Sequence, residues 1–387
     1  MFSTKQLDSF KKRTTPFYFY DLNLFRKTLE QIKEHGVSKG YHIHYALKAN
    51  SHPQILAEIV KAGLSADCVS GGEVERATEC GFSPNKIAFA GVGKRDIEIE
   101  IGLKNNILCF NVESVQELQV IDQLASQNNQ TARVALRINP NVDANTHKYI
   151  TTGLKENKFG INEKDLPDIF KLLPTLNNIE LVGIHFHIGS QIEKLEPFKK
   201  LCLRANELND IFENKGYTLT IINVGGGFGI NYSNPDENGI PDFKKFFGTF
   251  EKHINLKPHQ QLHFELGRSV VGQSGSLITR VLFTKTGIEK NFAIIDAGMT
   301  ELIRPALYQA KHEIQIISDH ANRPEKQYEI VGPICESSDV FRTGYEIAEL
   351  KRGDILAIRS CGAYGEVMKS QYNLRHEIGT AFSDETE

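Results

Sequence analysis

The sequence predicts an α/β fold, a parallel (β/α)8 TIM barrel joined to a second, mostly antiparallel β domain. Short apolar segments alternate with helical patterns eight times over roughly 230 residues. After Arg268 this alternation stops, and short strands separated by turns take over. A doubly wound sheet also alternates strands and helices, but it spreads the residues at its strand ends along a line. A barrel gathers into one ring the distinctive residues that follow the predicted strands: Lys48, Asp67, Arg137, His187, Gly225 to Gly227 and Glu265.

The eight barrel strands are predicted from short apolar runs bounded by polar and glycine residues. They cover residues 42–47, 65–69, 87–91, 108–112, 133–138, 181–188, 220–224 and 261–265. Helical spacing of apolar residues predicts helices between them, among them 53–62, 74–80, 115–124 and 198–212.

Both ends of the chain are assigned to the second domain. Residues 1–15 are polar and are predicted to be frayed or loosely docked, whereas residues 17–20 form a strand. Asp21 is expected to cap a helix that starts at Leu22. We expect strand 17–20 to join the strands predicted at 281–283, 292–296, 329–331 and 355–358. The barrel then covers residues 36–268, and the β domain covers residues 1–35 and 269–387.

The composition is ordinary for a soluble globular protein. Hydrophobic residues make up 40%, charged residues 24%, and the formal net charge is -3, so neither nucleic acid nor an anionic membrane is expected as a partner. No apolar run approaches the roughly 18 residues of a membrane span, and no secretory signal is recognisable at the N-terminus. The 6 cysteines form no C-x-x-C pair, which argues against a structural zinc site and favours reduced thiols in the cytoplasm.

Lys48 stands at the end of the first barrel strand, just before Asn50 and Pro53 break it. A lysine at the end of a buried strand is costly unless its amine is neutralised, paired or used covalently. Such an amine can form a Schiff base with a carbonyl compound. Taken alone, Lys48 is explained more simply as a lysine that reaches into solvent.

Two histidines and a glutamate follow later barrel strands. His185 and His187 point to the same side of a strand and could together ligate a metal. His185 is explained more simply as a hydrogen-bonded barrel residue, and His187 is nearer the strand end. Glu265 needs a cationic or N–H partner, which could be a protonated ring nitrogen or the nearby Arg268.

The run Gly225 to Gly227 offers backbone N–H groups that could converge on a phosphate. The dinucleotide fingerprint requires a further glycine, but the two candidate positions hold Ile230 and Tyr232. A Rossmann site is therefore excluded, and a tight turn is the commoner role of such a run.

The β domain adds two groups of polar residues. Arg304 and Tyr308 could clamp a carboxylate, because arginine offers a bidentate fork. Cys335 stands beside Glu336 and close to Asp339, which favours a neutral, proton-donating thiol over a thiolate. Glu336 could recognise an amine.

In their order and number, these segments resemble the fold-type III, PLP-dependent amino-acid decarboxylases from Thr15 to about Tyr372. Within that family the similarity is greatest to members that act on meso-2,6-diaminopimelate. The segments that carry the resemblance are 45–50, 70–73, 137–140, 158–161, 187–191, 225–229, 265–268, 304–308 and 335–337.

The resemblance implies a role for each residue. Lys48 would hold pyridoxal 5'-phosphate (PLP) covalently, His187 would stack on its ring, and Glu265 would pair with the ring nitrogen. Cys335 would return a proton after CO2 leaves. The remaining cofactor contacts would come from Ser190, Gly225, Gly226, Gly227, Gly267, Arg268 and Tyr364, and the substrate contacts from Arg268, Arg304, Tyr308, Glu336 and Tyr364.

The implied reaction is decarboxylation of diaminopimelate to L-lysine, the last step of lysine biosynthesis. The implied assembly is a homodimer with shared active sites, in which Cys335 and Glu336 come from the partner chain. Leu266 departs from the family, which usually has proline there. The serious alternative is the same chemistry on lysine, ornithine or arginine. A metal-dependent hydrolase would need further ligands at other strand ends, and a catalytically silent relative that regulates a partner would be expected to lack Lys48 or Cys335.

Overall fold

The computed structural model describes residues 2–143, 158–237 and 239–385, which fall into two compact units. One unit comprises Leu29–Gly229 and Asp242–Gly267, and the other comprises Met1–Thr28, Ile230–Pro241 and Arg268–Glu387. The segment Ile230–Pro241, which the sequence assigned to the barrel, therefore groups with the β unit.

The first unit is the predicted parallel barrel, and its eight strands close into a ring. Closure is made by the first and last strands, which pair in parallel with Ile43 opposite Phe264 and His44 opposite Glu265. The strands are β2 (His42–Ala46), β3 (Ser65–Cys68), β4 (Ile87–Phe89), β5 (Cys109–Val112), β6 (Ala132–Arg137), β7 (Ile179–His185), β8 (Ile221–Asn223) and β9 (Gln261–Leu266). The predicted barrel is confirmed, and the predicted strand ends differ from these by at most a few residues.

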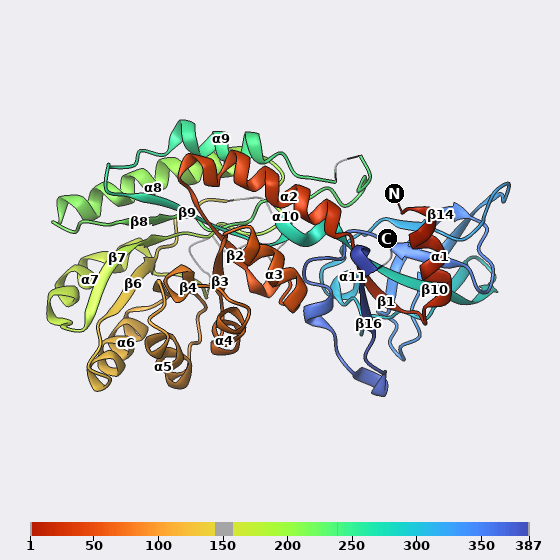
Figure 1. Cartoon of the computed structure of the whole chain (residues 1–387), viewed down its shortest axis with the longest axis horizontal. Helices are drawn as coiled ribbons and strands as arrows, with labels where there is room; N and C mark the ends of the chain where they lie inside the picture. Colours follow the sequence, from red (N-terminus) through yellow and green to blue (C-terminus); the bar gives the residue numbers. More distant parts are fainter. Residues whose placement is uncertain (1, 144–157, 238, 386–387) are drawn as a thin grey trace. The chain divides into compact units, whose positions relative to one another are not determined.

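Helices of this unit lie outside the ring of strands (Figure 1). Ser70 and Ser114 begin two of them, because each side chain accepts the backbone N–H three residues on. The helices are α3 (Pro53–Lys61), α4 (Gly71–Glu79), α5 (Asp96–Lys104), α6 (Val115–Gln127), α7 (Leu166–Leu172), α8 (Glu196–Asn214) and α9 (Phe243–His253), while α2 (Leu22–His35) runs from one unit into the other. Among the described residues, no helix has the length and apolar character needed to cross a membrane.

Helix α9 sets the orientation of the last barrel strand. Its Phe247 and Phe250 pack edge-on against Phe264 of β9, with ring centres 5.1 and 4.8 Å apart. Successive side chains of a strand point to opposite faces, so the packing of Phe264 against the helix turns Glu265 into the barrel.

The second unit is built on a sheet of eight strands, most of them antiparallel. Strand β1 (Phe17–Tyr20) pairs antiparallel with β10 (Gly275–Thr286) and parallel with β16 (Gly379–Phe382), which confirms that the N-terminal strand joins this domain. The other strands are β11 (Asn291–Ile295), β12 (Ile314–Ile316), β13 (Glu325–Val331), β14 (Val340–Ala348) and β15 (Ile355–Ile358), and the helices α10 (Arg268–Val271) and α11 (Arg304–Tyr308) are short.

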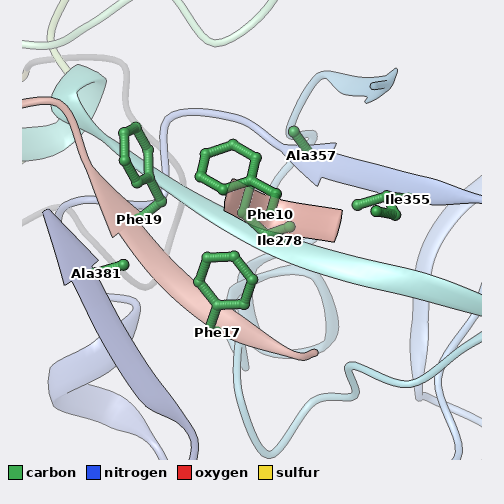
Figure 2. Packing of buried hydrophobic residues seen from close by; sticks show 7 residues of the cluster. All are labelled: Phe10, Phe17, Phe19, Ile278, Ile355, Ala357 and Ala381. Carbon is green, nitrogen blue, oxygen red and sulfur yellow. The ribbon is translucent and has the colours of Figure 1, made fainter. Parts of the chain in front are cut away.

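Residues 2–15 are folded and docked, so the prediction that the N-terminal segment is frayed or loosely docked is wrong for them, and Met1 lies outside the described residues. Residues Thr4–Lys12 form helix α1, which starts at a capping box between Ser3 and Gln6. Phe10 is fully buried and packs edge-on against Phe17 and Phe19 of β1, with ring centres 5.6 and 4.9 Å apart (Figure 2). This aromatic cluster gives an otherwise polar helix enough apolar contact to dock.

Two buried histidines fill part of the barrel interior. The Nδ1–H of His44 donates to the carbonyl of Ala66 at 3.2 Å, so its Nε2 must accept from Nδ1–H of His263, 2.9 Å away. Burial lowers the pKa of His44 to about 4, although Glu265 acts in the opposite direction. His44 is therefore neutral in the folded protein at any pH above that value.

We expect His44 to make the folded state acid-sensitive. Its folded pKa lies below that of an unfolded histidine, so only the unfolded state gains a proton as the pH falls from about 6.5 to about 4. The unfolding free energy of the wild type, measured in urea, should fall by about 3 kcal/mol more over this range than that of His44→Gln. Parallel pH profiles for the two proteins would contradict this assignment.

Candidate active site

Lys48 lies in a single 3-10 turn, Leu47–Ala49, directly after strand β2. Its Nζ donates to Oδ2 of Asp67 at 2.5 Å, and Asp67 is fully buried on the neighbouring strand β3. Burial raises the pKa of Asp67, as does the nearby Glu265, while the ammonium of Lys48 opposes both effects. The Lys48 side chain is itself 37% exposed, so this amine is paired and accessible and is not deeply buried.

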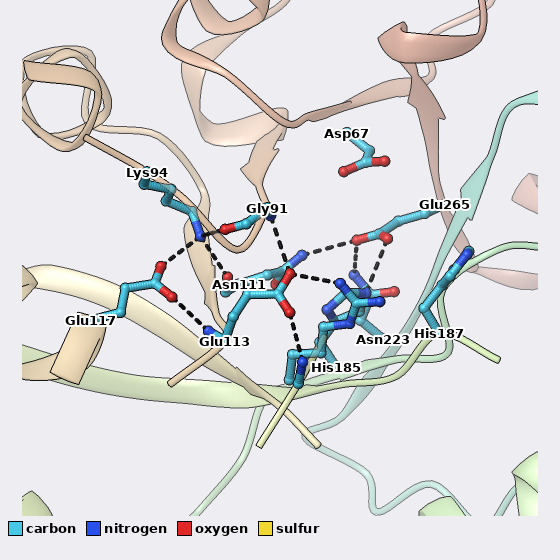
Figure 3. Close-up of polar contacts among 12 residues, drawn as sticks. Asp67, Gly91, Lys94, Asn111, Glu113, Glu117, His185, His187, Asn223 and Glu265 are labelled. Carbon is cyan, nitrogen blue, oxygen red and sulfur yellow. Dashed lines mark hydrogen bonds and ion pairs between the residues drawn. The ribbon is translucent and has the colours of Figure 1, made fainter. Parts of the chain in front are cut away.

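Glu265 lies in the barrel interior with its carboxylate hydrogen-bonded by three strands (Figure 3). Oε1 accepts from the amides of Asn111 and Asn223 at 2.9 and 2.8 Å, and Oε2 accepts from Nε2 of His185 at 3.0 Å. Burial by itself would raise the pKa of Glu265, but His185 and Lys48 outweigh burial and lower it. Glu265 is therefore ionised, and His185 serves as its hydrogen-bonded barrel partner.

A second buried network supports the first. Lys94, whose side chain is 1% exposed, donates to Glu117 at 2.6 Å and to the carbonyl of Asn111 at 2.9 Å. Glu113 accepts from Nη1 of Arg137 at 2.6 Å and from the N–H of Gly160 at 2.9 Å. Figure 3 shows Lys94 with its partners Glu117 and Asn111, and Glu113 beside them. The network thus fixes the strand end that presents Asn111 to Glu265.

His187 is held beside the glycine run. Its Nδ1 accepts the N–H of Gly226 at 3.2 Å, so this nitrogen carries no proton. Burial and the cations of Arg137 and Lys48 lower the pKa of His187 to about 3. A neutral, oriented imidazole is the form suited to stacking on an aromatic ligand.

The glycine run is required by close backbone packing. A Cβ on Gly225, Gly226 or Gly227 would lie 2.1, 1.8 or 2.4 Å from a carbonyl oxygen of a neighbouring segment. Gly225 and Gly226 also use their N–H groups inside the barrel, on Asn223 and His187. The backbone N–H groups of these two glycines therefore have partners within the barrel in this structure. Ser190 is partly exposed, and Gly267 is buried after β9.

The second unit holds two buried arginines close to aromatic rings. Nη1 of Arg268 donates to the hydroxyl of Tyr232 at 2.6 Å, and its guanidinium carbon lies 4.8 Å from the ring centre of Tyr364. Arg304 lies 5.0 Å from the ring centre of Tyr232 and donates to Nε2 of His312 at 2.9 Å. Arg268 and Arg304 are only 7% and 5% exposed, and among the described residues no carboxylate lies within ion-pair distance of Arg304. Tyr308 ends the same short helix, α11, that Arg304 begins, and it is partly exposed.

Cys335 and Glu336 are exposed in the loop between β13 and β14. The buried side chain of Asp339 stabilises this loop. It is 3% exposed and accepts the N–H groups of Ile334 and Met299 at 2.8 and 2.6 Å. The Asp339 carboxylate is occupied by these bonds, so of the two carboxylates expected around Cys335 only Glu336 is exposed with it. Glu336 also accepts the hydroxyl of Tyr372 at 2.7 Å.

Comparison with known proteins decides the family. The sequence pattern described as "Pyridoxal-dependent decarboxylase, pyridoxal binding domain" matches residues 23–272. The chain belongs to the pyridoxal-dependent decarboxylases. The family resemblance inferred from the sequence is confirmed, and the cofactor of the decarboxylase is PLP.

Several relatives of the decarboxylase carry one name. A diaminopimelate decarboxylase of Bacteroides thetaiotaomicron is 52% identical, over 98% of both chains. A crystal structure of the Helicobacter pylori diaminopimelate decarboxylase with L-lysine superposes with a TM-score of 0.91 at 41% identity, covering 97% of this chain and 94% of that one. The M. jannaschii diaminopimelate decarboxylase in complex with L-lysine gives a TM-score of 0.86 at 33% identity, covering 97% and 89%.

The side chains in the barrel fit PLP. The decarboxylase offers a lysine amine for the aldehyde, an ionised carboxylate at Glu265 for a protonated ring nitrogen, and a neutral imidazole at His187 for the ring face. The buried Oδ1 of Asp67 has no hydrogen-bond partner among the described residues, so a further polar ligand would be accommodated there.

The residues that hold these groups in place were not predicted from the sequence. Asn111 and Asn223 are polar residues inside short apolar strands, a signal that could have identified them as inward-pointing. Tyr232, His312 and Lys94 stand in polar segments without a comparable pattern. Only the fold brings them to the carboxylate and the arginines that they contact.

Removal of the buried lysine should destabilise the decarboxylase. Lys94→Met leaves Glu117 buried without its cation, so we expect the unfolding free energy to drop by about 3 kcal/mol. Lys94→Met/Glu117→Gln should recover part of that loss, because no charge is then left unpaired. Urea unfolding measures both. The exposed pair Lys171–Asp168 provides the control, since Lys171→Met should change the free energy by less than about 1 kcal/mol. Equal effects at the two sites would refute a buried charge pair.

Proposed function

We propose that this chain decarboxylates meso-2,6-diaminopimelate to L-lysine and CO2, the last step of lysine biosynthesis. The names of its relatives support this activity, and the L-lysine in two solved relatives is the product that it would release. The observation that carries the choice of substrate is Arg304, a buried cation for which the described residues supply no carboxylate. A buried charge calls for a charged partner, and a substrate with a second carboxylate would supply it.

The barrel residues, together with Arg268 of the second unit, would bind the cofactor and set the protonation of its ring. Bound PLP supplies an electron sink for the bonding electrons left when CO2 departs. Lys48 would hold it covalently and, paired with Asp67, keep its amine positioned for exchange with the amine of the substrate. Glu265 would keep the ring nitrogen protonated, which maximises its electron demand, while His187 would cover one face of the ring. Ser190, Gly227, Gly267 and Arg268 are the candidates for the phosphate end, with Gly225 and Gly226 shaping the backbone beside it.

The second unit would recognise the substrate. Arg268, Arg304 and Tyr308 suit the carboxylate that is retained, Glu336 suits the ammonium beside it, and Tyr364 would line both ligands. Cys335 is exposed and free, as a thiol that returns a proton to the substrate carbon must be.

We propose a homodimer in which Cys335 and Glu336 act in the partner's active site. The loop that contacts them supports a covered surface: Leu374 is 91% exposed with a φ of 53°, Tyr372 is 49% exposed, and the side chain of Asn373 accepts the N–H of Cys335. An exposed leucine in a left-handed conformation is more easily explained if a second copy buries it. We place the enzyme in the cytoplasm, because all six cysteines are free.

Lys48 provides the first test. The purified protein should absorb visible light, and borohydride reduction followed by peptide mass analysis should find the cofactor mass on Lys48. Lys48→Ala should abolish CO2 release, because the amine that would hold PLP covalently is lost. Lys61→Ala, on the exposed face of α3, should retain activity. Retained turnover in Lys48→Ala would rule out the assignment.

Arg304 provides the test of substrate. CO2 release should be measured with diaminopimelate, lysine, ornithine and arginine, and diaminopimelate should be preferred. Arg304→Ala should weaken binding of diaminopimelate by more than about 2 kcal/mol, because a charged pair is lost from a buried site. Arg352→Ala, on an exposed side chain of the same unit, is the control. Full affinity in Arg304→Ala, or preference for one of the three other amino acids, would sink the proposal.

A further inference from the structure

His312 has both ring nitrogens committed to partners of opposite character. It follows α11, is 1% exposed, and lies between Arg304 and the backbone of Arg359. Its Nε2 is 2.9 Å from Nη1 of Arg304, and its Nδ1 is 2.8 Å from the carbonyl oxygen of Arg359. Cys361 Sγ is a third neighbour, 3.6 Å from Nδ1.

These partners determine where the imidazole proton lies. A carbonyl oxygen can only accept, so Nδ1 carries the hydrogen. A guanidinium can only donate, so Nε2 must be the bare nitrogen that accepts from Arg304. Burial and the charge of Arg304 lower the pKa of His312 to about 3, in agreement with a neutral ring. His312 therefore holds Arg304 by a lone pair and adds no charge.

Tyr232 completes a neutral frame around both arginines. Its ring lies against Arg304 and packs edge-on against His312, with ring centres 5.0 Å apart, while its hydroxyl accepts from Arg268. These neutral side chains orient the guanidinium of Arg304 and do not neutralise its charge. A glutamate in place of His312 would orient the guanidinium equally well, but its carboxylate would compete with any anionic ligand.

We propose that His312 is a positioning residue for substrate selection: as a neutral acceptor it fixes Arg304 and leaves the guanidinium charge for the carboxylate that diaminopimelate keeps. This inference rests on the proposed function. It assigns to His312 no contact with cofactor or substrate, because it acts through Arg304.

The test compares three variants of the PLP-loaded enzyme. His312→Gln keeps a neutral acceptor. His312→Glu introduces a side chain of nearly the same shape as glutamine but with a negative charge, and His312→Leu has no acceptor. Each is assayed for KM and kcat with diaminopimelate and for inhibition by two probes, L-lysine, which retains the recognised carboxylate, and pentane-1,5-diamine, which lacks it. Thermal unfolding and PLP absorbance are measured for each variant.

We expect His312→Glu and His312→Leu to raise KM for diaminopimelate and the inhibition constant of L-lysine at least tenfold, with a smaller change in kcat. His312→Gln should stay within about threefold of wild type, and inhibition by the diamine should change by less than about twofold in all three. In an Arg304→Ala background the His312 variants should add no further loss, because the two residues act as one unit.

Two results would overturn the inference. One is an equal loss for L-lysine and the diamine, which would indicate a general structural role. The other is equal behaviour of His312→Gln and His312→Glu, a comparison that remains decisive if His312→Leu fails to fold. Failure of the proposed function is recognised separately, since the wild-type enzyme would then not release CO2 from diaminopimelate.

Discussion

The hydrogen bonds to Glu265 are the constraint on which the barrel's chemistry depends. Its carboxylate is held by Asn111 of β5, His185 of β7 and Asn223 of β8 while Glu265 itself lies on β9. Strands β5 and β9 are four places apart in the closed ring, so the side chains meet across the interior. An open sheet with these strands would take Asn111, one of the three donors, away from the charge. The ionised state of this buried carboxylate therefore depends on closure of the barrel, which brings its donors together.

The two units solve opposite electrostatic problems. In the barrel, a buried negative charge is held by amide and imidazole donors, and the neighbouring glycine run lets the backbone segments approach one another closely. In the β unit, two positive charges are kept by phenol, aromatic faces and a neutral imidazole. Each frame orients its charge without cancelling it. Both charges thus remain able to act on a ligand, which agrees with a cofactor site in the barrel and a carboxylate-selecting site in the β unit.

The barrel could be predicted because its strands and helices are periodic, and candidate site residues could be proposed because they follow those strands. Other features have no local signal. Helix α1 was missed because its docking depends on Phe17, Phe19 and Ile278, which lie outside the helix. Asn111 and Glu265 are 154 positions apart, and no pattern in one segment indicates the other. Lys94 stands in a polar segment that reads as a surface loop, and only the folded chain shows that its amine is buried. The hydrogen bonds of Gly225 and Gly226 to Asn223 and His187 likewise have no signal in the glycine run itself.

The pairing of β1 has a consequence for the order in which the chain can fold during synthesis. All eight barrel strands have been made once Leu266 has left the ribosome, so the ring can close early. Strand β1 must wait, because its partners β10 and β16 are made later, the last of them with Phe17 opposite Gly379. Until then Phe10, Phe17 and Phe19 lack the surface that buries them in Figure 2. The first aromatic residues to emerge are therefore among the last to be covered, which leaves apolar surface exposed on the nascent chain.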